Sequence, residues 1–174
     1  EENPFTADME FIHLDFNTVF LEKHELYKEI NKNIELKSNI LIDLLNAKET
    51  KSLIYAGTYT NIDNVSNLIL SKFQEKNCDL LNQFANWLGK NYDYNWSLTN
   101  LIKRGTGIHN GRLHRSLSQI QIKLFEDENG INNIISTASI IEGVNTSAEN
   151  VIIWMNKNGN SNLNDFTYRN IIGR

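Results

Sequence analysis

Six small or polar residues lie just beyond the apolar segments of this chain, and their types suit the binding of phosphate groups. They are Gly57, Thr58, His109, Gly111, Thr137 and Ser139. Glycine lets backbone N–H groups approach a ligand closely, and hydroxyl groups supply further hydrogen-bond donors. Donors of this kind hold successive backbone phosphates of a single strand with little regard to its base sequence. The six residues are therefore candidate contacts for backbone phosphates, and an ordinary loop is the alternative for the segment that follows Ile135.

The strands that would position these residues are short apolar runs without polar alternation. One lies in the segment SLIYAGT, Ser52–Thr58, another ends at Ile134 and Ile135, and a third covers residues 151–153. Runs of this kind are typical of buried parallel strands. In open α/β sheets, ligands bind at the carboxyl ends of such strands. The polar residues that follow the runs are thus placed where a ligand is expected.

Helical spacing of apolar residues between these runs completes the pattern. Residues 60–73 show this spacing, with Thr60 and Asp63 as the predicted capping pair. A second helix is predicted to start at Asp79, which would cap it, and to stop at Gly89. Alternating strands and helices predict an α/β fold with a parallel, doubly wound sheet.

Two tryptophans and a basic stretch could also contact nucleic acid. Trp87 and Trp96 could stack on bases, but the leucines around them favour core packing. No acidic residue occurs between Asp93 and Glu126. That stretch holds Lys103, Arg104, Arg112, Arg115 and Lys123 together with His109 and His114. It reads equally well as a locally positive binding surface or as a solvated face.

Four segments occur in an order that resembles one protein family. They read SLIYAGT, GIHNGRLHR, STASIIEGVN and YRNIIGR, and they extend from Ser52 to Arg174. The ordered set resembles the second RecA-like domain of superfamily two DEAD/DEAH-box helicases. The GIHNG and EGVN forms look closest to the DExH branch that includes the Ski-like and archaeal repair helicases. The chain departs from the family patterns at three positions. Asn110 stands in place of a second histidine and Ser147 in place of a proline, and both leave the branch open. Asn170 stands in place of a glutamine.

The resemblance implies a RecA-like parallel sheet of the P-loop NTPase type, with helices on both faces. Two such domains close on ATP, and the first supplies the phosphate loop and the acidic residue that holds Mg²⁺. The second supplies an arginine across the cleft, and Arg174 matches this catalytic position. Gly143, Asn145 and Asn170 match other ATP-binding positions. ATP and Mg²⁺ would be bound mainly by an upstream RecA-like domain, with single-stranded DNA or RNA as the second partner.

The chain lacks part of the chemistry that such an enzyme needs. It contains neither the phosphate loop GxxxxGK[ST] nor an acidic box after a strand, so it is predicted not to hydrolyse ATP unaided. His109 and His114 have no cysteine or carboxylate partners nearby, and no metal site is expected. Residues 1–37 are predicted to be a linker from a missing upstream domain. Residues 38–174 are predicted to form the RecA-like domain, which ends within its last motif.

Composition bounds the function further. The 174 residues carry a net charge of −4, which argues against a domain that holds nucleic acid by bulk electrostatics. An acidic start and the lack of an apolar run near the ~20 residues of a membrane helix predict a cytoplasmic protein without membrane contact. The alternative function is a nucleic-acid-binding module of the same fold without ATP turnover. A receiver-like or flavodoxin-like domain would need an acidic cluster or a phosphate loop after the first strand, and the segment SLIYAGT contains neither.

Overall fold

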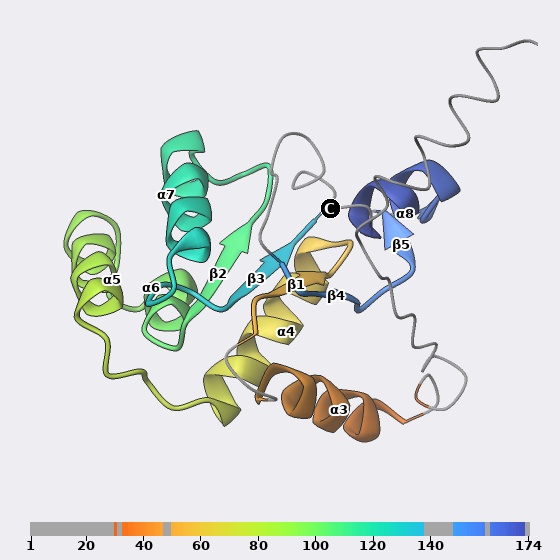
Figure 1. Cartoon of the computed structure of the whole chain (residues 1–174), viewed down its shortest axis with the longest axis horizontal. Helices are drawn as coiled ribbons and strands as arrows, with labels where there is room; N and C mark the ends of the chain where they lie inside the picture. Colours follow the sequence, from red (N-terminus) through yellow and green to blue (C-terminus); the bar gives the residue numbers. More distant parts are fainter. Residues whose placement is uncertain (1–29, 31–32, 47–49, 138–147, 159–160, 173–174) are drawn as a thin grey trace, which may run out of the picture. The chain divides into compact units, whose positions relative to one another are not determined.

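The computed structural model describes residue 30 and residues 33–46, 50–137, 148–158 and 161–172 (Figure 1). The chain divides into two compact units, Glu1–Lys37 and Ser38–Arg174. The described part of the first unit holds the start of helix α3 (Ile34–Asn46), where the Asn33 side chain accepts a hydrogen bond from the backbone N–H of Leu36 at 3.0 Å. The remainder of the fold belongs to the second unit.

A four-stranded parallel sheet forms the centre of the second unit. Its strands are β1 (Ser52–Tyr55), β2 (Thr106–His109), β3 (Asn133–Ser136) and β4 (Asn150–Ile153), in the order β2-β3-β1-β4. Every residue of β1 and β3 is buried, as the unalternating apolar runs predict for the two central strands. The α/β class and the parallel sheet are thereby confirmed.

The helices connect and cover these strands. They are α4 (Tyr59–Lys72), α5 (Asp79–Asn91), α6 (Ser97–Ile102), α7 (Arg115–Glu126) and α8 (Asp165–Ile172), and a short antiparallel hairpin pairs β5 (Lys157–Asn158) with β6 (Ser161–Asn162). The crossover from β1 to β2 runs across the sheet in the direction opposite to the crossover from β2 to β3. Because parallel crossovers are right-handed, α4 and α7 lie on opposite faces of the sheet (Figure 1).

Three predicted helix ends differ from the structure. Helix α4 is capped by Thr58, whose hydroxyl oxygen accepts a hydrogen bond from Asn61 N at 3.2 Å, and not by Thr60 and Asp63. Thr58 is extended and follows a glycine, so the chain turns into the helix two residues earlier than predicted. Helix α5 has Cys78 and not Asp79 at its N-cap position, and it continues past Gly89 to Asn91. The ring of Tyr94 packs so closely on Gly89 that a Cβ there would collide with it.

The edge strand β2 is held by one buried side chain of α7. Gln121, which is 1% exposed, accepts a hydrogen bond from Ile108 N at 2.7 Å and donates one to Leu117 O at 3.2 Å. A backbone N–H on an open sheet edge needs a partner when it is buried. Gln121 supplies that partner and fixes α7 against β2, the strand that ends in His109.

Replacing Gln121 by leucine is expected to lower the free energy of unfolding by about 1–3 kcal/mol, because Ile108 N–H would stay buried without a partner. The measurement is urea unfolding, read as a lower midpoint at an unchanged slope. Gln119 lies exposed on the same helix, so Gln119→Leu is the matched control. Equal stabilities of the two variants would contradict the anchoring role.

Candidate functional site

The carboxyl ends of three neighbouring strands lie at the same level of the sheet. Tyr55 and His109, the last residues of β1 and β2, both pair with Ser136, the last residue of β3. The chain segments that follow are tied together by Ala56 N donating to Ser136 O at 2.8 Å and Thr137 N donating to His109 O at 3.2 Å. Five of the six residues predicted to contact single-stranded nucleic acid therefore lie along one edge of the sheet.

The segment after β1 is fixed by a close backbone approach. Gly57 has φ +76°, a conformation that side-chain-bearing residues rarely adopt, and a Cβ there would collide with the carbonyl oxygen of Lys157. That same oxygen accepts a hydrogen bond from Tyr55 Oη at 3.0 Å. Asn61 Nδ2 donates to Ala56 O at 3.0 Å. The loop that presents Gly57 and Thr58 is therefore held from both sides.

The segment after β2 is organised by Asn110. Its Oδ1 accepts hydrogen bonds from Arg112 N at 2.9 Å and Leu113 N at 3.1 Å, which bends the chain into a turn around the exposed Gly111. The Arg112 guanidinium then lies over the Tyr59 ring, 4.0 Å from its centroid. This cation–π contact connects the loop after β2 to the first residue of α4.

His109 ends β2, the outer strand at one side of this edge, and is half-buried. Burial lowers the pKa of its imidazole below the ordinary 6.5, and a hydrogen bond between the ring and its own backbone partly offsets this. The ring is therefore neutral at pH 7. A neutral imidazole donates one hydrogen bond and accepts another, so His109 can serve as a neutral contact to a polar ligand.

A cavity of about 110 Å³ lies beside these loops, between α4, α6 and the turn after β2. Its apolar wall consists of Ile62, Leu98, Ile108 and Leu113. Two rings and three polar side chains complete it: Tyr59, Trp96, Asp63, Ser97 and Asn110. The strand-end residues had been expected from the sequence, but this cavity had not. The spacing of Tyr59 and Asp63, one helical turn apart directly after a strand, was its only local signal.

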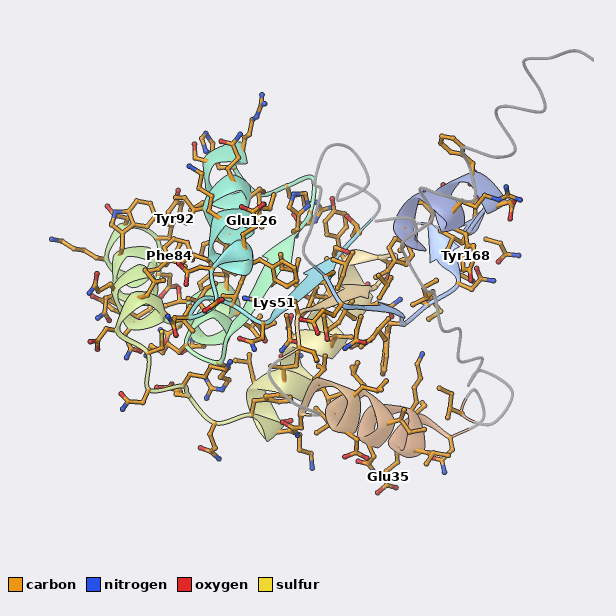
Figure 2. All side chains as sticks on the ribbon, viewed as in Figure 1. Glu35, Lys51, Phe84, Tyr92, Glu126 and Tyr168 are labelled. Atoms are coloured by element: carbon orange, nitrogen blue, oxygen red, sulfur yellow. The ribbon has the colours of Figure 1, made fainter. Side chains whose placement is uncertain are left out.

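Aromatic rings extend from this cavity over α5. Trp96 lies 5.5 Å from Tyr92, Tyr92 lies 6.0 Å from Trp87, and Trp87 stacks on Phe84 at 6.3 Å, measured between ring centroids. Figure 2 labels Tyr92 and Phe84 of this row. Trp87 is 45% exposed, so the expectation of core packing is wrong for this residue. Helix α5 buries the stripe of Leu81, Ala85 and Leu88 instead, and Trp87 lies beside that stripe.

The basic stretch does not form a single surface. Lys103 and Arg104 precede β2, so they lie toward the amino-terminal edge of the sheet, where both contact Glu75 at 4.0 and 3.4 Å. Arg104 also donates to Phe73 O and Asn100 O. Arg112, in contrast, lies at the carboxyl-terminal edge. Positive charge next to the strand-end residues is therefore supplied locally by Arg112.

The other predicted site residues lie partly or wholly outside the described residues. Ser139, Gly143 and Asn145 belong to residues 138–147, and Arg174 ends the chain. Asn170 is described only by its backbone, in helix α8. Within the part of the chain that the structure describes, no three His, Cys, Asp or Glu side chains form a group able to hold a metal ion. None of the described helices combines the length and apolar character needed to cross a membrane.

The lowered pKa of His109 predicts a pH-dependent stability. Between pH 6.5, the ordinary pKa, and the lower pKa of the folded state, the unfolded chain binds more protons than the folded chain. The contribution of His109 to the free energy of unfolding is therefore complete above pH 6.5 and is lost as the pH falls through this window. NMR titration should place the His109 midpoint below 6.5. His109→Gln should flatten the stability curve below pH 6.5, and a midpoint above 6.5 would contradict the assignment.

Comparison with known proteins gives one relationship. No protein-family model matches the chain. The chain is 30% identical over 164 residues to Anti-bacteriophage protein B of Escherichia coli strain K12. The match covers 94% of this chain and 22% of that protein, so the chain spans about a fifth of the relative's length. The likeness extends through the whole sheet and its carboxyl-terminal edge.

Proposed function

We propose that the chain is the second RecA-like domain of an ATP-dependent nucleic-acid helicase or translocase of superfamily two. The observation that carries the proposal is the convergence of the segments after β1, β2 and β3 at one sheet edge. There Thr58, His109 and Thr137 offer polar groups beside Gly57 and Gly111. A parallel α/β sheet with helices on both faces is the architecture that the helicase motifs require.

The carboxyl-terminal edge of the sheet suits a nucleic-acid backbone for electrostatic reasons. Helix α4 begins directly after Thr58, so the partial positive charge of its amino terminus is directed at this edge. The Thr58 hydroxyl oxygen accepts from Asn61 N, and its hydrogen is left to donate to a phosphate. Arg112 adds a full positive charge nearby. Backbone phosphates of single-stranded DNA or RNA are the ligands of this edge in the proposal.

In the parent protein, ATP would bind between this domain and a second one. An upstream RecA-like domain would bind most of the nucleotide and its Mg²⁺, and Gly143, Asn145, Asn170 and Arg174 would complete the site from this chain. Arg174 would stabilise the charge on the transferred phosphoryl group. Closure and opening of the two domains around ATP would then move the strand. The likeness to Anti-bacteriophage protein B supports a further assignment, that the parent protein acts against bacteriophage.

Thr137→Val is expected to weaken binding of a single strand about ten- to a hundredfold, because it removes one hydroxyl hydrogen bond to a charged phosphate. Fluorescence anisotropy with a labelled oligonucleotide measures this in the chain itself. Thr50→Val removes a hydroxyl at the opposite edge of the sheet, where Thr50 accepts from Asn150 Nδ2 at 3.1 Å, and should leave affinity unchanged. Equal effects of the two changes would remove the support for this edge as the strand site.

Arg174→Ala in the parent protein is expected to lower strand-stimulated ATP hydrolysis by ~10³-fold or more while strand binding persists. Arg169→Ala is the matched control, because Arg169 is an exposed residue of α8 whose ion pair with Asp165 at 3.0 Å spans one helical turn. Turnover at the wild-type rate in Arg174→Ala would reject the role of this arginine. Strand binding without any turnover in the wild-type parent would favour the alternative of a binding module.

A further inference from the structure

The cavity beside the strand-end loops is small and open on one side. Its volume is about 110 Å³, and a cavity of about 150 Å³ in another protein holds benzene. It is smaller than that benzene cavity, so it admits only part of a ring system, and the remainder would lie in its open mouth. Ile62, Leu98 and Ile108 are buried and give the floor an apolar surface, from which water is readily displaced.

Two aromatic residues border this floor. Trp96 is half-buried and is held against Tyr92 at 5.5 Å, and Tyr59 is held beneath the Arg112 guanidinium at 4.0 Å. Both rings are therefore fixed before a ligand arrives. Base–aromatic stacking is the main source of affinity for unpaired bases, and rings that are already ordered lose little entropy when a base binds.

The polar side chains of the cavity define which ring it suits. Asp63 is an exposed carboxylate that offers two acceptor oxygens and no donor. Asn110 spends its Oδ1 on two backbone N–H groups, which leaves its Nδ2 as a donor. The lining thus offers a pair of acceptors and one donor. Guanine presents the complementary set, with two adjacent N–H donors and one carbonyl acceptor on a single edge.

The cavity also lies next to the residues that are proposed to contact the nucleic-acid backbone. Tyr59 directly follows Thr58, and Asn110 lies between His109 and Gly111, so lining residues and backbone-contact residues alternate along the same two loops. We propose that this cavity binds a single guanine base of the bound strand, stacked against the ring walls and recognised by Asp63 and Asn110. The inference rests on the proposed function and adds base preference to it.

A carboxylate is an unusual residue to place beside a polyanion. Asp63 repels the phosphate backbone, so it costs affinity for every strand and is compensated only when a base donates to it. Its removal separates the two effects. Asp63→Asn should raise affinity for strands without guanine slightly and should abolish the preference for guanine.

The test measures binding of the chain to three labelled twelve-nucleotide probes by fluorescence anisotropy at fixed salt. One probe is oligothymidylate, the second carries a single central guanine, and the third carries inosine there, which lacks the amino group of guanine. The wild-type chain should bind the guanine probe on the order of tenfold more tightly than oligothymidylate. Inosine should lose most of this gain. Asp43→Asn on α3 changes net charge equally, lies outside the cavity and should keep the preference.

The outcomes separate this inference from the proposed function. Binding of all three probes with equal affinity would overturn the guanine site and leave the strand-binding edge standing. A guanine preference that survives Asp63→Asn would also overturn it. Failure to bind any probe would overturn both the strand-binding edge and the guanine site. A preference lost in Asp63→Asn and kept in Asp43→Asn is the result expected.

Discussion

The parallel register of β1, β2 and β3 is the constraint on which the rest of this structure depends. Parallel pairing aligns the last residues of these strands, Tyr55, His109 and Ser136, so every connecting segment leaves the sheet at the same level. In an antiparallel sheet, successive connections would alternate between opposite edges. The alignment brings together loops that begin after residues 55, 109 and 136, and no local interaction could do so.

Two side chains, at the amino-terminal edge of the sheet and at the open side of β2, help to maintain this register. At the amino-terminal edge, Lys51 Nζ donates to Asp127 O at 2.6 Å and Ile131 O at 3.1 Å, which ties the start of β1 to the loop before β3 (Figure 2). Burial lowers the pKa of Lys51, yet its hydrogen bonds hold the ammonium group in place. At the open side of β2, Gln121 pairs with a backbone N–H of the strand.

The carboxyl-terminal edge combines rigid backbone with exposed polar groups. Gly57 is enclosed by the Lys157 carbonyl group, and Asn110 holds the turn after β2 through two hydrogen bonds. Tyr59 and Arg112 join the two loops through a cation–π contact. A site held in this way loses little entropy on binding, which favours affinity for a flexible single strand. The cavity between α4, α6 and this turn arises from the same three elements.

The sequence by itself determined the class of the fold and the identity of the strand-end residues. Unalternating apolar runs such as Leu53–Tyr55 must be buried on both faces, and this fixes a parallel sheet covered by helices. The sequence misplaced the caps of α4 and α5 and the environment of Trp87, although the contacts at these positions are local. Several polar residues near a helix start can cap it, and local propensity does not choose among them. Only the tertiary structure decided that Tyr59, Trp96 and Asn110 share one cavity. Such packing follows from how helices seat on the sheet, which local propensity does not encode.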